Sequence, residues 1–165
     1  MQGRDASGIF DAMRPRLIAT ALLLACSPSP DDVPPFPFGR AHADCGPADG
    51  PAVRIQLGTN PSSPDLAIPA SRPHLELVLN AALTEAGGQR FLIDPEGRGR
   101  NATAHAGFCG ESGDCAPAAS GWIRLDPVSN PPSEIRGTFD VELPDQTRLS
   151  GRFTAAWIAF SPMCG

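Results

Sequence analysis

Hydrophobic and polar residues alternate most clearly near the C-terminal end of the chain. Over residues 135–143 every second side chain is apolar or glycine, and the positions between them are polar. The same alternation returns over residues 149–157, after the turn sequence Pro144-Asp145-Gln146-Thr147. A period of two indicates a strand with one buried face, and a turn between two such strands indicates a hairpin. We therefore predict an antiparallel hairpin in this region.

Further segments have the same strand pattern upstream. Residues 53–57 alternate cleanly, residues 89–94 are a short apolar segment before the turn Pro95-Glu96-Gly97, and residues 121–125 are a further segment that opens at a glycine. Residues 75–86 fit two patterns, a strand over 75–79 or a helical stripe closed by Gly87. Because strands lie on both sides, we predict a strand over 75–79. A short helix over 81–86, after this strand, is compatible with the pattern.

Glycine recurs in these strands, in Gly137-Thr138-Phe139, in Gly151-Arg152-Phe153 and at Gly121. Glycine weakens a strand unless the sheet bends there or an aromatic ring covers the bare backbone. The pattern predicts a coiled sheet around one core. The apolar phase of the strands supplies the expected core residues, which are Ile55, Leu75, Leu77, Phe91, Ile123, Leu125, Phe139, Val141, Phe153 and Trp157.

A chain of 165 residues has room for one globular domain. Its regularly spaced short strands predict an all-β fold, a single small antiparallel β-sandwich or β-barrel-like domain over residues 45–165. The 17 glycines, 19 prolines and complete absence of lysine indicate a GC-rich bacterial genome. A formal net charge of −5 gives no general attraction to a phosphate backbone, so we expect no nucleic-acid partner.

The N-terminal region has the pattern of an export signal. Arg14 and Arg16 precede the apolar residues 17–25, which are too short to span a bilayer. Leu23-Leu24-Ala25-Cys26 resembles the lipobox of bacterial lipoproteins. The resemblance implies cleavage of a signal peptide over residues 1–25 and lipidation of Cys26. Because Met13 is a better start for this signal, we expect residues 1–12 to be an over-long gene start. A plain secretory signal with an unrelated cysteine is the alternative.

Residues 26–44 contain the lipidated cysteine and a Pro-rich tether. Their composition favours extended conformations and provides too few apolar residues for a core. Phe36 and Phe38 are exceptions, and we expect them to fold back against the domain or to dock a partner. Ser27 at the second position of the mature chain favours sorting to the outer membrane.

Four cysteines remain once Cys26 is assigned to lipid, namely Cys45, Cys109, Cys115 and Cys164. An even number in an exported chain predicts two disulfides. Cys109 and Cys115 bracket a short glycine-containing turn, which favours their pairing and leaves Cys45 with Cys164. Zinc ligation by these thiols is disfavoured, because their spacing does not match that of structural zinc sites.

Several of these features together resemble small lipoproteins of myxobacteria and related GC-rich bacteria. They are the segment from Cys45 to Ala52, the Cys109–Cys115 loop before Gly121, the Gly-x-Phe hairpin and the closing Cys164-Gly165. Ile158 stands where the pattern has a further cysteine, so one cross-link of that pattern is missing. The resemblance implies export and a disulfide-stapled β domain, and it implies no particular chemistry.

Catalytic signatures are weak in this sequence. It lacks the Gly-x-Ser-x-Gly, His-Glu-x-x-His and P-loop motifs. Asp140 and Glu142 share a strand face at a spacing compatible with a glycosidase pair, although such a face is usually only solvated. Residues 94–101 offer oxygen ligands around a turn as a calcium loop would, but they include two arginines. His42, His74 and His105 are too far apart in sequence to suggest a ligand set.

The expected function is a lipid-anchored cell-envelope module, in the outer membrane, that binds or supports an envelope protein or glycan without catalysis, cofactor or metal. The alternative is a secreted envelope hydrolase with a site of scattered carboxylates. Convergent polar groups of perturbed pKa in a concave site would favour the enzyme. A filled β core with shallow surface grooves would favour the module.

Overall fold

The computed structural model describes residues 35–46, 50–95, 103–129 and 132–164. The expected signal peptide, Cys26 and the first part of the tether lie outside the described residues, as does most of the candidate calcium loop. No helix in the described part of the chain is long and apolar enough to cross a membrane. The described elements are β1 (Phe38–Cys45), β2 (Pro51–Gly58), β3 (His74–Leu79), α1 (Leu83–Ala86), β4 (Arg90–Ile93), β5 (Thr103–Cys109), β6 (Cys115–Pro117), β7 (Ser120–Leu125), β8 (Glu134–Glu142) and β9 (Arg148–Trp157).

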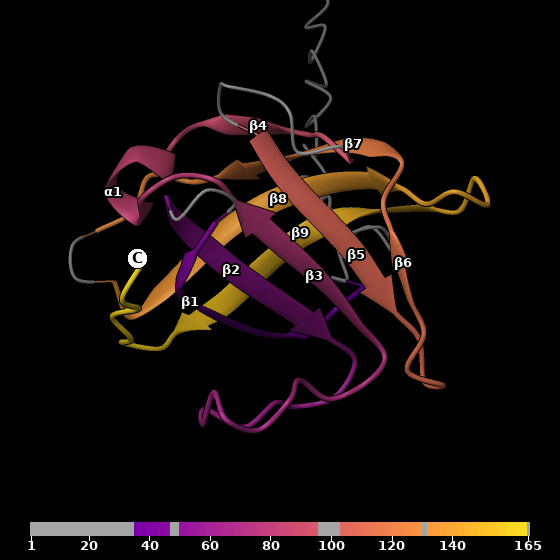
Figure 1. The fold of residues 1–165 in the computed structure, drawn as a ribbon, viewed down its shortest axis with the longest axis horizontal. Helices are drawn as coiled ribbons and strands as arrows, with labels where there is room; N and C mark the ends of the chain where they lie inside the picture. Colours follow the sequence, from indigo (N-terminus) through magenta and orange to yellow (C-terminus); the bar gives the residue numbers. More distant parts are fainter. Residues whose placement is uncertain (1–34, 47–49, 96–102, 130–131, 165) are drawn as a thin grey trace, which may run out of the picture.

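The strands form an all-β domain that closes on itself (Figure 1). Hydrogen-bonded neighbours follow the order β3-β2-β1-β9-β8-β7-β4-β5, and β5 also pairs with β3, which completes the ring. The structure is therefore a closed barrel. On the same edge, β5 pairs with β4 at its beginning and with the short strand β6 at its end. Two of the pairings, β1 with β9 and β4 with β5, are parallel, whereas the sequence predicted only antiparallel pairs.

The interior of the barrel is filled with side chains from the apolar phase of each strand. Nine of the ten expected core residues are buried, and Trp157 is partly exposed while packing against the core. Small residues line part of the wall, because Ala41, Ala104 and Ala106 point inward beside Ile55 and Leu77. A filled interior agrees with the usual packing of narrow eight-stranded barrels.

The hairpin predicted from the C-terminal alternation is present as β8 and β9. Gly137 lies opposite Phe153, and Phe139 lies opposite Gly151. A Cβ atom at Gly137 would lie 2.8 Å from Cζ of Phe153, so the ring covers the bare backbone as the Gly-x-Phe pattern predicted. Residues 74–79 form strand β3 and residues 83–86 form helix α1, so the ambiguous segment contains both a strand and a short helix.

The N-terminal boundary of the domain differs from the prediction. Residues up to 44 were expected in the tether, but Phe38–Cys45 form β1, which lies between β2 and β9 in the ring. Phe36 is 5% exposed and packs against Phe139, with 6.1 Å between the ring centroids. The tether prediction was wrong from residue 36 onward, because Phe36 packs into the core and β1 pairs with the adjacent strand β2 and with the distant strand β9.

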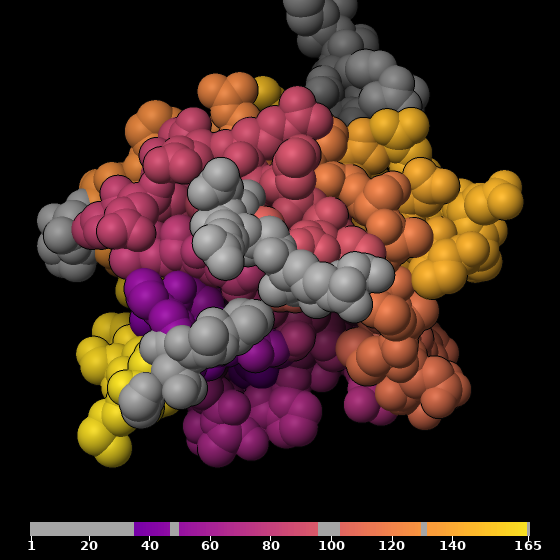
Figure 2. All heavy atoms as spheres, turned by 45° about the horizontal axis from the view of Figure 1, so that its top comes forward, coloured from indigo at the N-terminus to yellow at the C-terminus, as the bar shows by residue number. Residues whose placement is uncertain are grey.

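Two disulfides are present, and they join the expected pairs. Cys45 and Cys164 are 119 residues apart in sequence and 5.6 Å apart between Cα atoms. The bond holds the C-terminal segment beside β1, and in Figure 2 the yellow C-terminal residues lie against the indigo residues of the first strands. Cys109 and Cys115 close the turn between β5 and β6.

Candidate functional site

The carboxylates expected at a hydrolase site lie on the outer face of β8. Asp140 accepts a hydrogen bond from Nε of Arg148 at 2.6 Å and a second one from its Nη2. These bonds from Arg148 hold the pKa of Asp140 below its usual value. Glu142 accepts a hydrogen bond from the Ser120 hydroxyl at 3.3 Å. The carboxyl group of Asp140 is thus committed to an ion pair, which makes it a poor proton donor.

The three histidines lie on three different strands of the barrel wall. His42 in β1 and His74 in β3 are buried, and burial lowers the pKa of each. His105 in β5 is partly exposed. No group of three or more His, Cys, Asp or Glu side chains in the described ranges is arranged to hold a metal ion.

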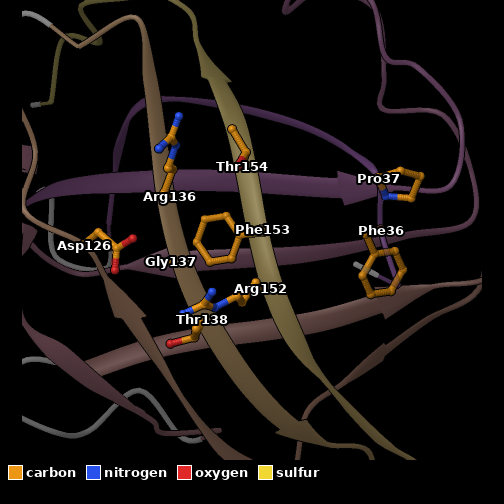
Figure 3. Close-up of a pocket in the computed structure, with 9 residues that line it drawn as sticks. All are labelled: Phe36, Pro37, Asp126, Arg136, Gly137, Thr138, Arg152, Phe153 and Thr154. Carbon is orange, nitrogen blue, oxygen red and sulfur yellow. The ribbon is translucent and has the colours of Figure 1, made fainter. Parts of the chain in front are cut away.

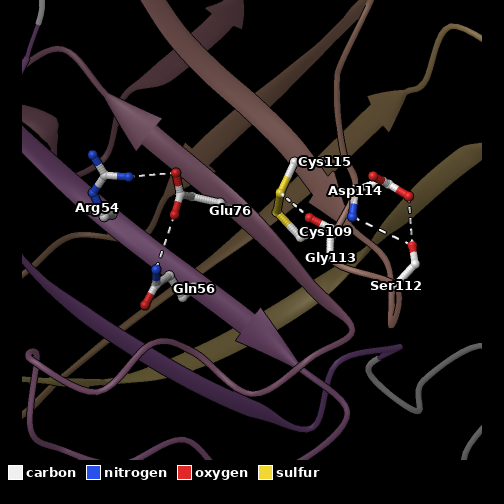
Figure 4. The surroundings of a disulfide bond; sticks show 8 residues. All are labelled: Arg54, Gln56, Glu76, Cys109, Ser112, Gly113, Asp114 and Cys115. Atoms are coloured by element: carbon white, nitrogen blue, oxygen red, sulfur yellow. Dashed lines mark hydrogen bonds and ion pairs between the residues drawn. A yellow bond between two sulfur atoms is a disulfide. The ribbon is translucent and has the colours of Figure 1, made fainter.

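A polar network covers the outer face of β1, β2 and β3. Arg54 forms ion pairs with both Asp44 and Glu76. Figure 4 shows its contact with Glu76, to which Gln56 also donates a hydrogen bond at 3.0 Å. Arg40 is 5% exposed and donates to Gln56 at 2.7 Å. Because each member already has partners inside the protein, this network is suited to holding strands together rather than to binding a ligand.

Arg40 also fixes the long connection between β2 and β3. Its guanidinium donates to the carbonyl oxygens of Ser63 at 2.7 Å and Ile68 at 2.9 Å. Sequence analysis placed Arg40 in the tether and assigned it no role. A buried arginine that binds backbone carbonyls has no local sequence signature, because its partners lie 23 and 28 residues away.

The turn closed by the Cys109–Cys115 disulfide lies beside this network in Figure 4. Within it, the Ser112 hydroxyl donates to the Asp114 carboxylate at 2.9 Å. A shallow hollow of about 230 Å³ lies between this region and β3. Its lining is mainly apolar, and consists of Glu76, Val78, His105, Ala106, Gly107, Cys115, Ala116 and Pro117.

A second surface depression lies on the barrel wall over β8 and β9 (Figure 3). It has a volume of about 450 Å³, within the usual range of small-molecule sites, and it is open to solvent. We call it the Arg–Thr depression. Its lining residues are Phe36, Pro37, Asp126, Arg136, Gly137, Thr138, Arg152, Phe153 and Thr154.

Two matching tripeptides supply the polar groups of this depression. Arg136-Gly137-Thr138 in β8 runs antiparallel to Arg152-Phe153-Thr154 in β9. The register places Arg136 opposite Thr154 and Thr138 opposite Arg152, so guanidinium and hydroxyl groups alternate diagonally across the two strands. This arrangement places two cations and two hydroxyl groups on one small surface.

The two arginines differ in their surroundings. Arg136 forms an ion pair with Glu134 on its own strand. Arg152 is exposed, and none of the described residues forms an ion pair or hydrogen bond with it. Asp126 supplies a carboxylate at the border of the depression. The site therefore presents one free and one singly paired guanidinium, with hydroxyl groups between them.

Chemically, this arrangement suits an anionic ligand that also carries hydroxyl groups. A guanidinium forms two parallel hydrogen bonds to a carboxylate or a phosphate. The threonine hydroxyls can donate or accept, and the Asp126 carboxylate accepts from a ligand hydroxyl. Sequence analysis treated these residues only as the polar phase of the hairpin. The repeated Arg-x-Thr tripeptide is the signal from which the site could have been found.

Comparison with models of known protein families, with curated proteins and with solved structures finds no significant match to this chain. The functional interpretation therefore depends on the chemistry of the described residues.

Proposed function

We propose that this protein is a lipid-anchored module of a bacterial cell envelope that binds an acidic glycan in the Arg–Thr depression. The observation that carries the proposal is the diagonal of two arginines and two threonines, with Arg152 free of an ion pair in the described structure. A uronic acid residue has both a carboxylate and several hydroxyl groups, which match the donors and acceptors of this surface.

The shape of the depression favours binding over catalysis. It is open to solvent and lies on the outside of a filled barrel, so it excludes little water from a bound ligand. A long polymer can lie along an open surface and place one charged sugar unit in the depression. The volume of about 450 Å³ is suited to one or two sugar units.

The alternative, a secreted hydrolase with Asp140 and Glu142 as its carboxylates, has less support. Hydrolysis of a glycoside requires one carboxylic acid with a raised pKa. The pKa of Asp140 is instead lowered by its hydrogen bonds from Arg148. Neither Asp140 nor Glu142 lines the Arg–Thr depression.

The proposed anchor is Cys26, supported by the charged segment, the apolar segment and Leu23-Leu24-Ala25 that precede it. Only eight residues lie between Cys26 and Pro35, so the linking segment reaches at most about 30 Å. Phe36 and Pro37 border the depression, so this linker would enter the barrel beside the proposed glycan site. Anchoring would hold the site within a short distance of the membrane that carries the protein.

The anchor is tested in the full chain by metabolic labelling with palmitate. We expect label in the wild type, none in Cys26→Ala, and release of the variant from the membrane fraction. Equal labelling of the two proteins would show that Cys26 is not the lipidated residue.

Glycan binding is tested with the chain from Ser27 to Gly165, which contains every described strand and lacks Cys26. Polygalacturonate serves as the acidic polymer and dextran as the neutral one. We expect binding to polygalacturonate alone, and a loss of roughly tenfold or more in Arg136→Gln/Arg152→Gln, because charge-assisted hydrogen bonds disappear.

A second double variant, Arg90→Gln/Arg124→Gln, is the matched control. It removes the same charge from strands β4 and β7, outside the Arg–Thr depression. We expect it to keep most of the affinity for polygalacturonate. An equal loss in both double variants would show that general charge, rather than the depression, attracts the polymer.

A further inference from the structure

An exposed apolar and basic patch lies on the outer face of β4 and β7. Leu92 is 60% exposed, and its partner across the strand pair is Trp122, which is half-buried. One row further along, Arg90 lies opposite Arg124. We call these four residues, Arg90, Leu92, Trp122 and Arg124, the Leu–Trp patch.

The arginine pair in this patch is unfavourable for the isolated barrel. Like charges directly opposite each other on neighbouring strands repel. Arg90 places its guanidinium 4.4 Å from the centre of the Trp122 ring, and neither Arg90 nor Arg124 forms an ion pair among the described residues. Asp140, opposite Trp122 on the other side, already binds Arg148. Arg90 also acts electrostatically on Asp140, but this carboxylate is shared with Arg148, so the positive charge of the pair is only partly compensated among the described residues.

We propose that the Leu–Trp patch lies on the surface of an anionic phospholipid membrane. Tryptophan is the side chain that favours the boundary between headgroups and acyl chains, and leucine beside it adds apolar contact. Arg90 and Arg124 flank these two side chains and complement lipid phosphates. Exposed leucine next to tryptophan favours a lipid surface over an acidic polysaccharide, which offers no apolar layer.

This inference rests on the anchor proposed above, because a patch of four residues gives only weak binding by itself. The linker from Cys26 to Pro35 keeps the barrel within about 30 Å of the bilayer. At such a high local concentration a weak contact is enough to set the orientation of the barrel. The Arg–Thr depression adjoins the Leu–Trp patch, because its Thr138 lies directly opposite Arg124, but Arg136 and Arg152 of the depression are not part of the patch.

The test uses the chain from Ser27 to Gly165, so that binding reports the patch without the lipid anchor. Co-sedimentation is measured with vesicles of phosphatidylglycerol and phosphatidylcholine, and with vesicles of phosphatidylcholine alone. We expect weak binding, measured at high lipid concentration, to the anionic vesicles only. Arg90→Gln/Arg124→Gln should weaken it about 25-fold, since each arginine at an anionic surface contributes about fivefold.

Arg136→Gln/Arg152→Gln is the matched control, with the same change in charge, and should weaken vesicle binding far less. A second measurement uses lipids brominated on their acyl chains, which quench a tryptophan at the membrane boundary. Quenching is expected in the wild type and should be lost in Trp122→Phe, which leaves Trp157 as the remaining tryptophan.

Absence of binding to anionic vesicles, equal losses in the two double variants, or no quenching of Trp122 would each overturn the inference. These results do not depend on palmitate labelling or on polygalacturonate binding. Failure of the membrane contact is therefore distinguishable from failure of the anchor or of the glycan site.

Discussion

Phe139→Ala is the substitution that tests the core most directly. Phe139 is 2% exposed and points into the barrel from β8. Its ring lies 6.1 Å from that of Phe36 and 6.4 Å from that of Phe153, measured between centroids. It also lies next to the bare backbone of Gly151, where a Cβ atom would be 3.9 Å from Cε1 of the ring.

The expected loss of stability follows from these contacts. Truncation of a buried phenylalanine to alanine costs about 3–5 kcal/mol. Each aromatic pair adds roughly 0.5–1.5 kcal/mol beyond the area it buries, and Phe139 belongs to two such pairs. We therefore expect a decrease of about 4–5 kcal/mol in the free energy of unfolding, a large share of the total of a small domain.

The assay is equilibrium unfolding in urea of the oxidised chain from Ser27 to Gly165, followed by tryptophan fluorescence and circular dichroism. Phe38→Ala is the control, because Phe38 is 41% exposed, and it should cost less than about 1 kcal/mol. If Phe139→Ala does not fold, Phe139→Leu gives a smaller measurable loss. A loss below about 1 kcal/mol in Phe139→Ala would show that the ring is exposed and that the inward phase of β8 is wrong.

Three other predictions concern the disulfide, the strand glycine and the histidines. Cys164→Ser should lower the free energy of unfolding by about 2–5 kcal/mol, because it opens the longest covalent loop, and chemical denaturation measures this loss. Gly137→Ala should cost about 1–3 kcal/mol, because the new methyl group would clash with the carbonyl oxygen of Arg124 and would lie 2.8 Å from Cζ of Phe153, and an unchanged unfolding midpoint would contradict the packing. Burial lowers the pKa of His42 and His74, so the unfolded chain takes up protons first as the pH falls below about 6.5. Stability should be full above that pH and decline below it in urea titrations, and His42→Gln should make the decline less steep.

Local patterns were sufficient for the strands whose inner residues are large and apolar. Strands β8 and β9 alternate phenylalanine, valine and leucine with polar residues, and their turn is marked by proline and aspartate. Strand β5 was missed because its inward residues include Ala104 and Ala106, whose small side chains give a weak hydrophobic signal. Strand β1 was missed because prolines precede it and its partners β2 and β9 supply the hydrogen bonds.

For the two proposed binding surfaces, the local pattern likewise predicted which residues are polar, and strand pairing decided which of them are neighbours. The sequence placed Arg136, Thr138, Arg152 and Thr154 on the polar phase of two strands, but not opposite one another. That placement depends on the register of β8 against β9. Arg90 and Arg124 are 34 residues apart and become neighbours only because β4 pairs with β7.

The sequence by itself determined the features that depend on near neighbours along the chain. These are the alternating strands, the apolar core residues and the short Cys109–Cys115 turn. Tertiary structure decided the features that depend on distant pairing, namely closure of the ring through β3 and β5, the parallel placement of β1 beside β9, and the arginine surfaces. The physical reason is that a side-chain period of two is set within one strand, whereas the choice of neighbouring strand is set by how the whole barrel buries its inner face.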